Sequence, residues 1–118
     1  MWSDVRYFNR EELMCEHCGA ENMNKEFMKR LDFVRYIYKK PMVVTSGYRC
    51  VAHDDEIGGK GNHPQGDAAD IRVNKGKDMY DFIAACIKAG IRRIILYKDS
   101  GHVHIDMNPD KQEGVFIL

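Results

Sequence analysis

The sequence has no long apolar run, no net charge, no repeat and no low-complexity segment. Its 18 lysines and arginines equal its 18 aspartates and glutamates in number, and it carries no basic tail. A chain with this balance creates no global field that would draw it to nucleic acid or to an anionic membrane. Residues 1–6 are too polar to form the apolar part of a secretory signal. We therefore expect a monomer without its own signal peptide that binds no nucleic acid and does not insert into a membrane.

The sequence also lacks a second Cys-x-x-Cys motif to match the one formed by Cys15 and Cys18. A closed structural zinc site needs four ligands, which His17 or Cys50 could complete. The favoured interpretation is a local turn packed by two reduced thiols without a second zinc, because no oxidising compartment is indicated. Cys86 lies within a helical apolar pattern, which predicts a buried free thiol.

What the sequence does contain is enough apolar residues for one core. Hydrophobic residues make up 44% of the 118 residues, which is ordinary for a globular protein, and the length fits a single domain over residues 1–118. Hydrophobic periodicity and end signals predict helices over residues 10–14, from the N-cap Asn24 to about 39, and over 77–89 before Gly90, with strands over 42–46, 68–73, 91–97 and 102–107. We predict an α+β fold with a small, mainly antiparallel sheet, helices on one face and the functional site on the other.

Two of the predicted strands carry polar residues that can bind metal on one face. Side chains alternate with period two along a strand, so every second residue shares a face. In the earlier strand, Asp70 and Arg72 lie opposite three apolar residues. In the later strand, His102, His104 and Asp106 share a face. The pattern predicts one buried face on each strand and imidazoles with carboxylates on the other.

His63 can join this polar face because it precedes Asp70 by seven residues, with Gly66 between them. The chain can turn at a glycine, where no Cβ obstructs. Two histidines and one aspartate leave zinc a fourth position for water, which is the arrangement of a catalytic site. The residues leave open whether His102 and His104 both bind, or whether one of them carries protons instead. We predict a zinc hydrolase with one zinc per chain.

Arg49 is a candidate for substrate binding, because it ends the first strand at the mouth of a long loop reaching about residue 67. Loops of this length are often functional. The paired donors of arginine match carboxylates and carbonyl oxygens. We predict that Arg49 contacts the substrate with Tyr48 and stabilises a developing oxyanion. The alternative is a salt bridge under the loop. Residues 54–56 look like a solvated acidic surface, and His53 is not expected to be a ligand.

Three motifs follow one another along the chain, namely Ser46-Gly-Tyr-Arg49, His63-x-x-Gly-x-Ala-x-Asp70 and His102-Val-His104-Ile-Asp106, and they are preceded by a Phe8 to Cys15 opening and a block starting at Pro41. In this order, the motifs resemble those of the zinc D-Ala-D-Ala peptidases and their hedgehog-like relatives, in particular small phage and prophage members. The resemblance implies that His63, Asp70 and His104 bind Zn²⁺ and that Arg49 engages substrate. The activity it implies is hydrolysis of a peptide bond in peptidoglycan stem peptides, often beside a D-alanine.

Two positions depart from this family pattern. Gly61 stands where a serine usually opens the metal motif, and Gly101 stands where several members carry an acidic general base. Small phage-type relatives often lack that acid as well. Asp99 and His102 are the candidate bases, with His102 favoured because strand periodicity places it beside His104.

The missing acid keeps other functions open. One is a zinc-retaining module that binds the cell wall or forms part of a phage particle without peptidase activity. Another is a peptidase that acts outside peptidoglycan. The sequence does not separate a carboxypeptidase from an endopeptidase. Without its own signal, the chain would reach the cell wall after release or as part of a phage particle.

Overall fold

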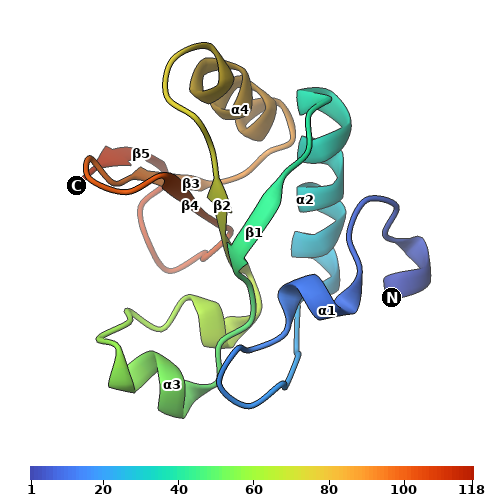
Figure 1. The fold of residues 1–118 in the computed structure, drawn as a ribbon, viewed down its shortest axis with the longest axis vertical. Helices are drawn as coiled ribbons and strands as arrows, with labels where there is room; N and C mark the ends of the chain where they lie inside the picture. The colour runs from blue at the N-terminus through green and yellow to red at the C-terminus, as the bar shows by residue number, and fades with distance from the viewer.

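The computed structural model describes residues 1–118 as one sheet with helices packed around it (Figure 1). In chain order, the elements are α1 (Arg10–Leu13), α2 (Lys25–Tyr38), β1 (Val43–Ser46), α3 (Val51–Glu56), β2 (Ala68–Arg72), α4 (Lys77–Lys88), β3 (Arg93–Leu96), β4 (His102–Asp106) and β5 (Gly114–Ile117), with 3-10 turns at Trp2–Asp4 and His63–Gln65. The predicted α+β class is confirmed. No helix combines the length and the apolar character needed to cross a membrane.

The two long helices begin and end where the sequence predicts. The Asn24 side chain caps α2 by accepting a hydrogen bond from the Phe27 N–H at 2.9 Å. Lys39 ends the same helix in a left-handed conformation with φ 64°. Gly90 follows α4 with φ 80°, a conformation that glycine adopts without the steric cost of a Cβ. Both helices therefore carry their own end signals.

α2 and α4 pack against one face of the sheet. Phe27, Leu31 and Val34 of α2 and Phe82 of α4 are almost completely buried in one apolar cluster. Alternate strand residues complete this cluster, namely Ala69, Ile71, Val103 and Ile105. The period-two prediction for β2 and β4 is thus confirmed for the apolar face. Truncating a buried leucine such as Leu31 to alanine typically costs about 2–5 kcal/mol.

The sheet has five strands in the order β1-β2-β4-β3-β5 and is mainly antiparallel, as predicted. The exception is β5, which pairs with β3 in parallel. β5 is not among the strands predicted from the sequence, because a short apolar run does not by itself distinguish a strand from other structure. The central pairing of β2 with β4 places Asp70 directly opposite His104. This register is what positions the candidate site.

The segment between β1 and β2 differs from the long loop that the sequence predicts. It contains α3 and the 3-10 turn at His63–Gln65. Asp54 in α3 is 2% exposed, so placing it on a solvated acidic surface was wrong. The physical reason is an ion pair that only the tertiary structure reveals, because the buried carboxylate contacts Arg49. Glu56 and Asp55 of the same helix are exposed.

Candidate metal centre

His63, Asp70 and His104 converge on the face of the sheet opposite α2 and α4. Each offers one ligand atom, and these atoms all lie within 4.8 Å of one another. Asp70 Oδ1 lies 3.0 Å from His104 Nδ1 and 3.5 Å from His63 Nε2. Strand pairing supplies two of these residues, and the 3-10 turn before Gly66 supplies the third. The three residues suggested by the sequence motifs are therefore together in space.

Each imidazole has an outer partner that fixes its orientation. The Nδ1–H of His63 donates to the Gly47 carbonyl oxygen at 2.8 Å, so its Nε2 lone pair is directed toward Asp70. The Nε2 of His104 lies 2.6 Å from Asp106 Oδ2. Metal-binding histidines typically donate their second N–H to a carbonyl or carboxylate in this manner. Asp106 thus orients His104, one of the candidate ligands.

The two carboxylates beside His104 favour a positive charge at this place, which either a proton on the imidazole or a metal cation can supply. Burial alone would lower the pKa of His104, but Asp106 and Asp70 hydrogen-bond to it and raise the pKa overall. Burial alone would raise the pKa of Asp70, yet His104 and His63 hold it well below its usual range. Metal binding requires neutral imidazole and ionised carboxylate and releases protons. The donor set, its orientation and its charge all fit a divalent cation such as zinc.

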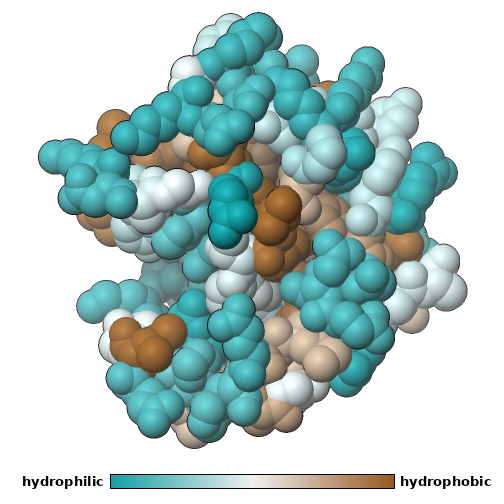
Figure 2. Space-filling model, in the orientation of Figure 1, coloured by the Kyte–Doolittle hydropathy of each residue, from teal (hydrophilic) through white to brown (hydrophobic).

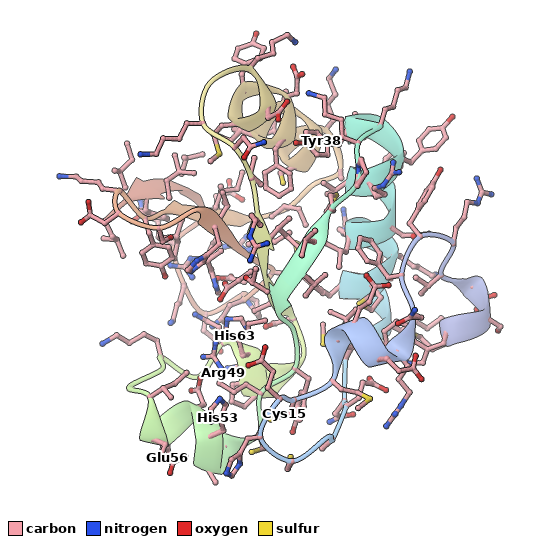
Figure 3. The ribbon with its side chains drawn as sticks, in the orientation of Figure 1. Cys15, Tyr38, Arg49, His53, Glu56 and His63 are labelled. Atoms are coloured by element: carbon pink, nitrogen blue, oxygen red, sulfur yellow. The ribbon has the colours of Figure 1, made fainter.

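Arg49 borders this group and is anchored by side chains of its own segment. Its Nη1 lies 2.7 Å from Asp54 Oδ1, and its Nη2 donates to Ser46 Oγ at 3.1 Å. The same Nη2 lies 4.0 Å from Asp70 Oδ2. Arg49 therefore makes the salt bridge of the alternative interpretation. Its guanidinium also lies beside the candidate ligands, as a role in substrate binding would require. In Figure 3, Arg49 and His63 lie next to each other above α3.

Asp54 organises the glycine-rich segment that follows α3. Its Oδ2 accepts a hydrogen bond from the Gly61 N–H at 3.0 Å. A Cβ at Gly59 would collide with the Asp54 carboxylate, which would then have to move from its contacts with Arg49 and Gly61. The glycines of residues 58–61 were the sequence signal for this close approach.

A cavity of about 380 Å³ opens beside the candidate ligands. In Figure 2 the surface is hollowed between α3 and the part of the sheet formed by β3 and β5. The lining includes the three candidate ligands, Arg49, the cationic residues Lys60, Arg93 and Lys111, and Ile95 and Tyr97. Tyr48 instead lines a neighbouring cavity of about 240 Å³, which shares Arg49 with the first.

The two candidate proton carriers do not line the 380 Å³ cavity. His102 lines a separate cavity, and its ring centroid lies 5.4 Å from that of Tyr97. Asp99 is exposed in the turn between β3 and β4. Tyr97 lines both cavities, so it separates His102 from the candidate ligands.

Tyr97 and Arg93 line the site although neither was predicted as a site residue from the sequence. Arg93 Nη1 lies 2.7 Å from Asp106 Oδ2, where it supports the partner of His104. Burial raises the pKa of Tyr97, and the nearby Asp70 charge raises it further. The available signal was period-two alternation, which places Arg93, Ile95 and Tyr97 on the site face.

Comparison with known proteins identifies the family of this chain. No curated protein matches the chain. The sequence profile described as Peptidase M15 matches residues 6–106, which contain all three candidate ligands and Arg49. Peptidases of this family depend on zinc, and the grouping of His63, Asp70 and His104 supports a zinc hydrolase. The match extends over most of the chain, and the chain belongs to the peptidase M15 family.

Proposed function

We propose that this protein hydrolyses peptide bonds in peptidoglycan stem peptides, next to D-alanine. The observation that carries the proposal is one cavity that holds His63, Asp70 and His104 together with Arg49. The cationic Lys60, Arg93 and Lys111 also line it. Stem peptides carry free carboxylates, which suit a cavity with several cationic groups.

His63, Asp70 and His104 would hold the zinc. When bound, zinc supplies a Lewis acid that polarises a carbonyl and lowers the pKa of a water molecule. The Gly47 carbonyl and Asp106 keep the two imidazoles oriented for this task. Correct orientation matters because small displacements of ligands weaken both metal binding and catalysis.

Arg49 would bind the substrate through its guanidinium. Asp54 and Ser46 hold two of its nitrogens, and the one nearer Asp70 borders the candidate ligands. A fixed guanidinium can donate to a scissile carbonyl or to a terminal carboxylate without reorganising during the reaction. Tyr48 would contact the substrate from the adjacent cavity.

His102 would transfer the proton from the nucleophilic water to the leaving amine, with Asp99 as the alternative. His102 lies on the same strand as His104, and its ring lies 5.4 Å from that of Tyr97, the residue between it and the candidate ligands, so proton transfer would require His102 to reach past Tyr97. Histidine is the side chain that most often serves in general acid–base catalysis.

A digest of defined muropeptides, read by mass spectrometry, tests this function. We expect zinc-loaded protein to cleave them, and His63→Ala and chelated protein to leave them intact. A pentapeptide substrate that loses D-alanine indicates a carboxypeptidase, whereas a cross-linked dimer that separates indicates an endopeptidase. Intact muropeptides after incubation with zinc-loaded wild type would refute the proposal.

A second candidate function is a zinc-retaining module that binds the cell wall or belongs to a phage particle. The observation that favours it is the position of His102 and Asp99, neither of which lines the candidate metal cavity. Sedimentation with purified cell walls separates the two functions. The module would sediment with walls and release no soluble peptide, whereas the hydrolase would release cleaved stem peptides.

A further inference from the structure

A second group of metal-binding side chains lies away from the His/Asp cavity. Cys15, Cys18 and Cys50 each offer a sulfur, and the three sulfurs lie within 4.8 Å of one another. His17 Nδ1 lies 3.7 Å from Cys50 Sγ. All four cysteines of the chain are free thiols. Figure 3 shows Cys15 close to the start of α3, on the same side as His53.

We propose that Cys15, Cys18, Cys50 and His17 form a structural zinc site, separate from the catalytic one. This differs from the sequence-based expectation of two reduced thiols in a local turn. The sequence offered Cys50 only as one possible partner 32 residues beyond Cys18, and folding brings it to the pair.

One measured distance is close to that of a tetrahedral site. Zn–S bonds of about 2.3 Å and Zn–N bonds of about 2.0–2.1 Å place sulfur and nitrogen roughly 3.5–3.6 Å apart in tetrahedral geometry. His17 Nδ1 lies 3.7 Å from Cys50 Sγ, and the three sulfurs lie within 4.8 Å of one another, so the exposed His17 ring would turn toward Cys15 and Cys18 to complete the set. A set of three cysteines and one histidine is a common closed combination for structural zinc.

The backbone around Cys15 is arranged as a compact ligand turn. The Cys15 N–H donates to the Ala20 carbonyl at 2.7 Å, and the Gly19 N–H donates to the Cys15 carbonyl at 2.8 Å. Gly19 has φ 74°, which closes the turn after the second cysteine. The turn thus keeps the first pair of sulfurs together without a disulfide.

Two contacts bring Cys50 to this turn. The Tyr48 N–H donates to the Leu13 carbonyl at 2.8 Å, and the Cys50 N–H points at Cys15 Sγ at 3.4 Å. A Cβ at Gly47 would collide with the Leu13 backbone, so the close approach requires glycine. Amide donors of this kind favour an ionised sulfur, the form that binds metal.

The closeness of the three sulfurs also favours a bound cation. Three thiolates within 4.8 Å of one another would repel, and a divalent cation between them would remove that repulsion.

The proposed site would brace the segment that carries Arg49. Cys50 is the N-cap residue of α3, and its side chain makes no capping hydrogen bond. α3 also carries Asp54, which holds Arg49 at 2.7 Å. His53 of the same helix stacks on the His17 ring, with centroids 5.1 Å apart. A zinc ion would therefore join the segment after α1 to the start of α3.

Zinc analysis after reconstitution under reducing conditions tests the proposal. We expect two zinc ions per wild-type chain, and one in the double variant His63→Ala, His104→Ala. Adding Cys50→Ser to that double variant should remove the remaining ion. Cys86→Ser in the wild-type background is the matched control. Cys86 is a buried free thiol outside the cluster, so this substitution should leave the count at two.

A second measurement covers the case in which a variant does not fold. Wild-type protein reconstituted with Co²⁺ should show the intense sulfur-to-metal charge-transfer absorption of a cysteine-rich tetrahedral site. One zinc per wild-type chain with no such absorption would overturn the proposal. A disulfide between any two of Cys15, Cys18 and Cys50 in the zinc-reconstituted protein would overturn it too.

Discussion

The two groups of metal-binding side chains in this protein are held by different kinds of structure. His63, Asp70 and His104 lie against a cavity, and two of them face each other across paired strands. Cys15, Cys18 and Cys50 come from a turn and from the N-cap of a short helix. An open three-residue set on a rigid sheet suits catalysis, whereas a closed sulfur-rich set between loops suits stability. Removing the first should abolish activity, and removing the second should chiefly destabilise the fold.

The largest expected effect tests this division directly. His63→Ala and His104→Ala should each lose zinc at the sheet site and all measurable hydrolysis, because each removes a ligand. Their melting temperatures should stay above that of Cys50→Ser, which should retain the sheet-site zinc. Metal analysis and thermal denaturation on the same samples check this. Full zinc retention at the sheet site in both histidine variants would contradict the ligand assignment.

The proton carrier gives the next largest effect. His102→Ala should keep zinc and fold while losing roughly two to four orders of magnitude in kcat, the usual size of a lost acid–base group. Asp99→Asn is the matched control, because it removes the nearest turn acid with little change in shape. If Asp99→Asn abolishes cleavage and His102→Ala does not, the aspartate is the base. Undiminished activity in both would place the proton carrier elsewhere, with Asp106 as the next residue to test.

Arg49→Lys should lower kcat/KM by about 100- to 1,000-fold, the range seen when one oxyanion donor is lost. Lysine keeps the charge but lacks the paired donors that contact both Asp54 and Ser46. Asp54→Asn separates the anchoring of Arg49 from its substrate binding, because it weakens the contact that holds Arg49 and leaves the Arg49 guanidinium unchanged. A fall in melting temperature without a fall in kcat/KM for Arg49→Lys would show that Arg49 is only structural.

Asp106→Asn should weaken zinc binding at the sheet site by about 10- to 100-fold, since Asp106 orients His104. The sulfur-rich site should keep its zinc in this variant. A competition titration with a chromophoric chelator measures both affinities. Equal weakening at the two sites would indicate a general loss of structure rather than a specific effect on His104.

The smallest effect distinguishes the two groups by pH in the metal-free protein. The pKa of His104 is raised above its ordinary 6.5 in the folded state, so its stabilisation is present below that value and is lost as pH rises. The pKa of Cys15 falls from 9.0 to about 6, so its stabilisation is present above 9.0 and is lost as pH falls toward 6. Urea titrations at a series of pH values from 6 to 9 give the free energy of unfolding at each pH. The dependence of this free energy on pH should change in opposite directions in His104→Gln and Cys15→Ser. The same change in both variants would contradict these pKa directions.

The sequence by itself determined the main elements and one face of each site strand. Asn24 and Gly90 are end signals that act locally, so the two long helices could be predicted without tertiary information. Period-two alternation made Asp70 and His104 face the same side of their strands. The ordered motifs from Ser46 to Asp106 pointed to zinc peptidases, and at that level the profile match shows the peptidase M15 family.

Only the tertiary structure decided which distant residues meet. Asp54 is buried because it pairs with Arg49, and an acidic run carries no local sign of that contact. Asp106 contacts both His104 and Arg93, since β3 lies next to β4 in the sheet. Cys50 joins Cys15 and Cys18 because the chain after β1 packs against the end of α1. Local propensity fixes elements and faces, whereas long-range pairing, which depends on the whole core, fixes the ligands of each site.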